Sequence, residues 1–336
     1  MNTICRALGT LLGASVLAGG GEELASRYQE GWTLRVEDAH VETFRLVSTR
    51  LLVHGEEVPT GEQLDEVEVE VEEFSSVFLD RYVAVEDGRA TELQRTFVEL
   101  QRTTQGIEGE SEDRGVLEDR TLVLELDGDG DVIATLEGEE DVDERFLEHF
   151  ELTYDVDVLL PSEEVEEGDS WSLEGEELER LLGLAQGPTY CDEEEDDDDE
   201  ELDELVREAS EIELTATLDA IEEYQGQRCG RIEVEISMVA EDLELDPALL
   251  GMDPTDFGVE DPESVDAIAR VDLQMSVEGV VWVSLEERRP METAFETEAS
   301  MTVALVLDGG EMELSFVLEF EIELSDETRW ERVDGN

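Results

Sequence analysis

The chain has 336 residues and a formal net charge of −75, because 96 residues are Asp or Glu and only 21 are Lys or Arg. Every basic residue is arginine, and the sequence contains no lysine. Nucleic acid and anionic membrane surfaces are poor partners for such a chain, since the electrostatic term that drives their binding would be repulsive. The composition is typical of adaptation to salt or of arginine-rich codon usage, and the first explanation predicts that sodium chloride raises stability by screening repulsion.

The amino terminus has the pattern of a secretory signal peptide. Arg6 supplies a positive charge, and the apolar stretch from Ala7 to Ala18 is too short to span a bilayer. Val16 and Ala18 are small enough for a cleavage site, so we expect residues 1–18 to be removed and the mature chain to be periplasmic or secreted. An uncleaved apolar helix is the alternative, and the sequence contains no second membrane-spanning stretch.

Strict alternation of apolar and polar residues dominates the rest of the chain, which predicts β-strands with one buried and one wet face. The pattern covers Asp65–Phe74, Glu211–Asp219, Arg231–Met238 and Glu311–Ser325. Two or three further strands are predicted between Arg270 and Leu307, with a break at Arg288–Pro290 because proline cannot donate to a central ladder.

Short turns join these strands. Asp87-Gly88, Gly226 and Gly309-Gly310 each separate two predicted strands, and such short connections require antiparallel neighbours. The sequence therefore predicts a mainly β (α+β) fold: a large curved antiparallel sheet or half-barrel with a few covering helices. We expect residues 19–336 to form a single domain; two β domains, about 30–185 and 206–330, are the alternative.

Asp127, Asp129 and Asp131 alternate like the first ligands of a calcium-binding loop. Counted from Asp127, however, the sixth residue of the loop is Val132 and the twelfth is Gly138, where such a loop needs glycine and glutamate. Apolar alternation continues on both sides of the aspartates. The pattern favours a tight hairpin turn, and weak calcium binding is the alternative.

Two helices are predicted, at Asp141–Leu152, where Asp141 and Glu144 form a capping box, and at Glu174–Ala185. A flexible acidic loop follows at about 191–204, which is a solvated segment or, alternatively, a calcium buffer. Loss of Cys5 with the signal peptide would leave Cys191 and Cys229, which either form a disulfide in an oxidising compartment or remain free thiols.

Catalytic motifs are missing from the sequence. His40, His54 and His149 are far apart and lack metal-ligand spacing, and no nucleophile elbow, zinc-protease motif or phosphate-binding loop is present. We therefore predict no catalytic residues and no resident cofactor, and a non-catalytic role. The tryptophans at positions 32, 171, 282 and 330 are interpreted as core or sheet-edge residues.

One block is more distinctive. Within Leu159–Leu173, the residues Leu160-Pro161, Val165 and Gly168-Asp169-Ser170-Trp171 resemble the "LP…V…GDSW" block of exported bacterial β-rich proteins of unknown function. The stretches "EYQGQRCGRIEVE" and "GVVWVSLEERRP" are similar to the closing hairpins of that group. The group is similar in outline to periplasmic lipoprotein carriers, whose half-open barrels enclose an apolar cavity.

The export signal, the amphipathic sheet and the absence of a catalytic motif predict a non-catalytic protein that binds a hydrophobic or lipidic ligand, or a partner, through the apolar face of its sheet. An acidic structural or calcium-buffering envelope protein is the alternative, and an enzyme with dispersed catalytic residues comes third.

Overall fold

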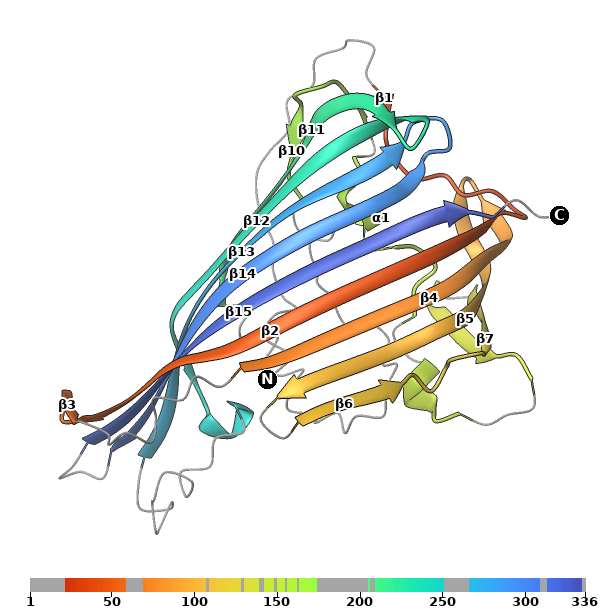
Figure 1. Ribbon diagram of the computed structural model, residues 1–336. Helices are drawn as coiled ribbons and strands as arrows, with labels where there is room; N and C mark the ends of the chain where they lie inside the picture. The colour runs from red at the N-terminus through yellow and green to blue at the C-terminus, as the bar shows by residue number, and fades with distance from the viewer. Residues whose placement is uncertain are drawn as a thin grey trace.

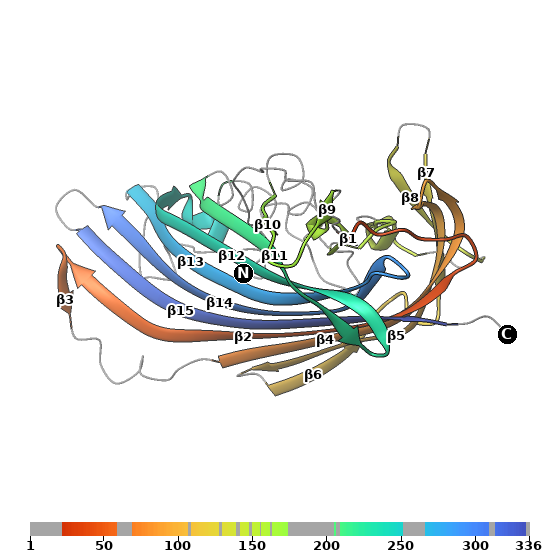
Figure 2. The same ribbon diagram turned by 90° about the horizontal axis from the view of Figure 1, so that it is seen from above.

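In the computed structural model of the protein, long antiparallel strands form one broad, curved sheet (Figures 1 and 2). The structure describes residues 22–58, 69–106, 109–127, 130–138, 142–147, 150–154, 156–161, 163–173, 205, 209–250, 266–308 and 313–333. The predicted mainly β fold with a large curved antiparallel sheet and few helices is confirmed.

The sheet contains strands from both halves of the chain. The first half supplies β2 (Thr33–Val53), β3 (Glu56–Val58), β4 (Val69–Glu86), β5 (Arg89–Gly106), β6 (Gly109–Arg114), β7 (Thr121–Leu126) and β8 (Val132–Leu136). The second half supplies β10 (Ser170–Trp171), β11 (Glu211–Tyr224), β12 (Gln227–Leu245), β13 (Asp266–Ser284), β14 (Arg289–Asp308) and β15 (Glu313–Arg332). A separate small pair is formed by β1 (Glu22–Glu23) and β9 (Glu164–Val165).

The spatial order is β10-β11-β12-β13-β14-β15-β2-β4-β5-β7-β8, with β3 beside β2 and β6 beside β5. The first long strand, β2, therefore lies beside the last, β15, and the two pair from Leu34 opposite Arg332 to Val53 opposite Leu314 (Figure 1). Strands from the two halves of the chain meet at this seam in the interior of the sheet.

The alternation seen in the sequence sorts the side chains onto two faces, because successive residues of a strand point to opposite sides. On β15, Leu318, Phe320 and Ile322 lie on the concave face, while the intervening Glu319 and Glu321 lie on the convex face. The convex carboxylates are partly paired with arginine, as in the contact between Arg45 Nη1 and Glu321 Oε2 at 3.1 Å.

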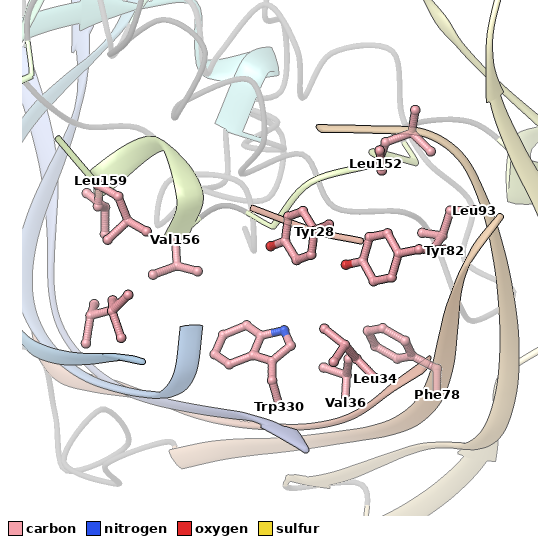
Figure 3. Close-up of a cluster of buried hydrophobic side chains, with 14 of the residues drawn as sticks. Tyr28, Leu34, Val36, Phe78, Tyr82, Leu93, Leu152, Val156, Leu159 and Trp330 are labelled. Atoms are coloured by element: carbon pink, nitrogen blue, oxygen red, sulfur yellow. The ribbon is translucent and has the colours of Figure 1, made fainter. Parts of the chain in front are cut away.

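One end of the concave face is fully covered, and we call it the closed end. Leu34, Val36 and Trp330 point from the sheet toward Tyr28, Val156 and other side chains of the segments above them (Figure 3). These covering segments are residues 24–32, 115–120 and 144–173 where described, and they include the short helices η3 (Glu144–Leu147) and α1 (Val156–Leu159). The closed end is the larger of the two apolar cores of the described chain.

A second apolar group, the distal cluster, lies farther along the same face. Its buried members are Met238, Ala240, Leu245, Ala269, Val271, Leu273, Met275, Ala299, Met301, Val303, Phe320 and Ile322. Leu250 of the 3₁₀ helix η4 (Pro247–Leu250) packs against it.

The predicted helix at Asp141–Leu152 is wrong in most of its described length. Only Glu144–Leu147 forms a 3₁₀ turn, and residues 142, 143 and 150 are not helical. Phe146, Phe150 and Leu152 are instead buried at the closed end, so tertiary packing outweighs the capping signal. The predicted helix at Glu174–Ala185 and the acidic loop at 191–204 lie outside the described residues.

Turn predictions agree with the structure where it describes them. Asp87 and Gly88 join β4 to β5 with φ of 52° and 86°, and Gln225 and Gly226 join β11 to β12 with φ of 49° and 81°. Residues 285–288 form the expected break before Pro290, which itself lies inside β14. Gly309 and Gly310 lie outside the described residues.

Candidate functional site

Polar side chains cross the apolar concave face between the closed end and the distal cluster. Along the β2–β15 seam the cross-strand pairs run Val36–Trp330, Asp38–Thr328, His40–Asp326, Glu42–Leu324 and Phe44–Ile322. We call Asp38, His40, Glu42, Asp326 and Thr328 the polar band. Trp330 and Ile322 are eight positions apart along the extended strand, a span of roughly 27 Å. The polar band therefore interrupts an otherwise apolar face at the seam.

Asp38 lies at the edge of the band nearest the closed end. The hydroxyl of Thr328 donates a hydrogen bond to its Oδ1 at 2.8 Å. Burial, together with the negative charge of Asp326, raises the pKa of Asp38 from 3.8 to about 7. The Thr328 hydrogen bond and the charge of His40 act in the opposite direction. Asp38 therefore exchanges a proton near neutral pH.

His40 and Asp326 face each other in the next row, with His40 Nδ1 3.7 Å from Asp326 Oδ2. Their side chains are 28% and 37% exposed, so solvent reaches both. Interaction with Asp326 raises the pKa of His40 above its usual value, while burial opposes the shift. The two groups therefore form an ion pair when the imidazole is protonated.

The strands beside the seam extend the band on one side only. Glu42 lies opposite Glu72 on β4, and Arg102 on β5 donates a hydrogen bond from Nη2 to Glu72 Oε2 at 2.8 Å. On the other side, Asp326 lies opposite Phe295 on β14. The ring of Phe295 rests on Gly279, where an added Cβ would lie 1.9 Å from the ring, so glycine is required at that position.

The closed end also buries a carboxylate, but surrounds it with donors. Asp80 is 0% exposed and receives hydrogen bonds from Arg95 Nε at 2.8 Å and Arg95 Nη2 at 2.7 Å. The hydroxyl of Tyr154 adds a third at 2.7 Å. Tyr28 donates to Asp157 at 2.7 Å, which ties the covering segments 24–32 and 144–173 to each other. This network holds the cover onto the sheet.

Apolar side chains on the other side of the band are less completely covered. Phe320 is 7% exposed, whereas Phe316 and Leu318 of the same strand are half-buried. Phe44 and Leu46 on β2 are also half-buried and pack against the distal cluster. At the seam, the concave face thus changes from a sealed core to a half-buried apolar row across the polar band, while the distal cluster beside that row is buried.

The aspartate-rich turn has a structural explanation. Asp127 Oδ1 accepts hydrogen bonds from the backbone N–H groups of Gly130 and Asp131, at 2.8 and 3.0 Å, between β7 and β8. Asp129 lies outside the described residues. Within the described ranges, no group of three or more His, Cys, Asp or Glu residues has a metal-binding arrangement.

Two other predictions concern cysteine and tryptophan. Cys229 is buried, with its Sγ 3.4 Å from Met291 Sδ, while Cys191 lies outside the described residues, so the disulfide stays a prediction. The predicted signal peptide, residues 1–18, also lies outside the described residues. Trp171 is half-buried and packs against the closed end, and its indole N–H donates to the carbonyl of Leu159 at 2.9 Å, in agreement with its interpretation as a core or sheet-edge residue.

Sequence reasoning did not identify the polar band. The signal was present, because Asp38, His40 and Glu42 occupy the same alternating positions as Val36 and Phe44 in "VEDAHVETF". Three polar residues in the buried register of a long strand are unusual and point to a site. Asp326 and Thr328 could be joined to them only once the pairing of β2 with β15 was known.

Comparisons with known proteins add no identification. No protein-family model matches the chain, and no curated protein matches it. Among solved structures, the chain aligns with the outer membrane protein OprG from Pseudomonas aeruginosa at 5% identity and a TM-score of 0.19, over 91% of this chain and 99% of that one. A structure described as "Asymmetric conductivity of engineered proteins" aligns at 8% identity and a TM-score of 0.18, over 89% and 100% of the two chains.

Both TM-scores are too low to support an argument about fold or function. In the described part of the chain, no helix has the length and apolar character needed to cross a membrane.

Proposed function

We propose that the chain is a non-catalytic exported protein that binds a hydrophobic or lipidic ligand on the concave face of its sheet. The observation that carries the proposal is the row of half-buried apolar side chains at the seam beside the distal cluster. Phe44, Leu46, Phe316 and Leu318 share one face there, and each remains partly accessible. Apolar surface of this kind is favourable to cover, at about 25 cal/mol per Å² removed from water.

Two further features support an apolar ligand rather than a protein partner that binds through charged groups. The convex face carries the exposed carboxylates of β12 to β15, among them Glu235, Glu298 and Glu321, which disfavour an apolar contact. The polar band next to the apolar row offers carboxylate, imidazole and hydroxyl groups. An amphiphile could place its polar end at the band and its apolar part along the row, an arrangement in which each part meets matching chemistry.

The proposal is tested with a charge placed on the concave apolar row. We expect Leu318→Arg to weaken binding of a neutral fluorescent amphiphile, N-phenyl-1-naphthylamine, by about tenfold or more, because burying an unpaired guanidinium against the ligand is costly. The matched control is Val239→Arg, which places the same charge on the opposite face at a residue that is 38% exposed. Fluorescence titration of both variants and the wild type measures the affinities.

Native mass spectrometry of protein purified from its own host provides a second measurement, with a co-purified lipid as the expected result. Equal binding by Leu318→Arg and wild type would contradict use of this face. If neither bound lipid nor probe binding is detected, the alternative role as an acidic structural or calcium-buffering protein becomes the one to test, by calorimetric titration with calcium.

A further inference from the structure

The polar band lies where it would control how far along the concave face an apolar ligand can extend. At the β2–β15 seam its three rows separate the closed end from the row of Phe44, Leu46, Phe316 and Leu318, whereas on β12 Ile236 packs against both apolar groups. An apolar ligand that extends from that row along the seam toward Trp330 covers Asp38 on the way. The protonation state of Asp38 then decides how much hydration such a ligand removes.

We propose that Asp38 is a proton switch for ligand binding: the concave face binds an apolar ligand tightly when Asp38 is protonated and weakly when it is ionised. This inference rests on the proposed function, because it assigns a regulation to the same face. The proton comes from solvent and returns to it, and no covalent bond changes.

The groups around Asp38 support this assignment. On its own strand it is accompanied by His40 and Glu42, and β15 contributes Asp326. From β4 and β5, Glu72 and Arg102 form their own ion pair. The described residues that face the band from β13 and β14 are not titratable, and they include Gly279, Phe295 and Thr297.

These contacts leave Asp38 as the sensitive group. His40 faces Asp326 and Arg102 faces Glu72, and the charge of His40 also acts on Asp38 from the neighbouring row. Asp38 receives its described hydrogen bond from the neutral hydroxyl of Thr328. Covering an ionised carboxylate that has one neutral donor is much more costly than covering the protonated acid, whose charge is absent. The raised pKa of Asp38, about 7, places the switch in the physiological range.

The switch predicts a specific pH profile for binding of N-phenyl-1-naphthylamine, which is uncharged throughout the range. Wild-type affinity should be flat below about pH 6.5 and fall by up to about tenfold per pH unit above about 7, because one proton is taken up on binding. Asp38→Asn, which mimics the protonated acid, should keep the tight affinity at about pH 8.5.

Glu298→Gln is the matched control, because it removes one negative charge from an exposed position on the convex face. It should follow the wild-type profile. A wild-type profile that is flat from about pH 5.5 to 8.5, or an Asp38→Asn profile that matches the wild type, overturns the switch while leaving the proposed function standing. If neither wild type nor Asp38→Asn binds the probe at any pH, both the proposed function and the switch are overturned.

A second variant tests the idea if Asp38→Asn does not fold, as judged by circular dichroism. Thr328→Val removes the hydrogen bond that lowers the pKa of Asp38 and should move the midpoint of the binding profile to higher pH. A midpoint that does not move, or that moves to lower pH, contradicts control by Asp38.

Discussion

Two carboxylates on the same concave face, Asp80 at the closed end and Asp38 in the polar band, show how the surroundings of a charge decide its role. Asp80 is 0% exposed and receives two hydrogen bonds from Arg95 and one from Tyr154. Asp38 lies only two cross-strand rows away, opposite Ser76, yet its described hydrogen bond comes from Thr328 alone. The first carboxylate is locked into a structural network, whereas the second can release or take up a proton near neutral pH.

The apolar parts of the face differ in the same way. At the closed end, Leu34, Leu93 and Phe97 are at most 1% exposed beneath covering segments that are tied to the sheet through Tyr154 and to each other through Tyr28. Beyond the band, Phe316 and Leu318 keep part of their surface accessible. A sealed core contributes more stability per side chain than a half-buried row, and a contiguous accessible apolar row is a feature of binding surfaces.

Removing the cation from the closed end should have the largest effect. We expect Arg95→Met to lower the free energy of unfolding by about 3–5 kcal/mol, because it leaves Asp80 buried without its charged partner. Urea denaturation followed by circular dichroism measures the change. The matched control is Arg270→Met, since Arg270 and Glu244 form an exposed pair whose loss should cost at most about 1 kcal/mol. Similar costs at the two positions would contradict the structural role of Asp80–Arg95.

Truncation of leucine should distinguish the sealed core from the accessible row. Leu34→Ala removes a side chain that is 0% exposed and should cost about 3–5 kcal/mol, because the cavity cannot collapse under a tied cover. Leu318→Ala, on the half-buried row, should cost about 1–2 kcal/mol, since part of its surface is already in water. Chemical denaturation of both variants gives the comparison, and a larger cost at Leu318 would show that the row is a closed core.

Stability should also report the protonation of Asp38. Its pKa is raised from 3.8 to about 7, so the folded state binds the proton more tightly than the unfolded state. Folding stability from this group is therefore fully present below about pH 4 and is lost as the pH rises toward 7. The raised pKa of His40 has the same sign: its contribution is present below its unfolded pKa and is lost as the pH rises through its folded one.

The Asp38 contribution is isolated by substitution. The shift corresponds to a ceiling of about 4 kcal/mol, and sharing of charge with Asp326 reduces the expected value to about 2 kcal/mol. Asp38→Asn should therefore be about 2 kcal/mol more stable than wild type at pH 8 and equal to it only near pH 4, where Asp38 is protonated in the folded state and largely so in the unfolded state. Denaturation at both pH values, compared with Glu298→Gln to remove the effect of overall charge, tests this. A gain that is the same at both pH values would exclude proton release from Asp38.

Much of the sheet could be predicted from sequence because each strand carries its own evidence. The alternation in Glu311–Ser325 and Glu211–Asp219 marks which residues face inward, and Asp87-Gly88 marks an antiparallel turn. The order of the strands in the sheet could not be predicted in this way. The pairing of β2 with β15 joins residues nearly 300 positions apart, and no local pattern in either strand specifies its neighbour.

The polar band could not be predicted for that same reason. Asp38 and Asp326 influence each other electrostatically only because the pairing of β2 with β15 brings them to the same face. The helix expected at Asp141–Leu152 shows the opposite limit, because its capping signal was clear but packing of Phe146 and Phe150 at the closed end determined the local structure. Both outcomes depend on long-range contacts that local patterns do not contain.

The smallest expected effect concerns the donor to Asp38. Thr328→Val keeps the shape of the side chain but removes the hydroxyl that donates to Asp38 Oδ1 at 2.8 Å. A hydrogen bond to a charged group contributes about 1.5–3 kcal/mol when buried, and partial exposure of Asp38 reduces the expected loss to about 1 kcal/mol. That loss should appear at pH 8, where Asp38 is ionised, and should be much smaller at pH 5, where it is protonated. Thr297→Val removes a hydroxyl from the same face of β14, at a residue that is 7% exposed, and its cost should not change between the two pH values. Equal pH dependence in the two variants would mean that Thr328 acts through packing, and the contrast between a fully compensated Asp80 and a sparsely compensated Asp38 would then lose its basis.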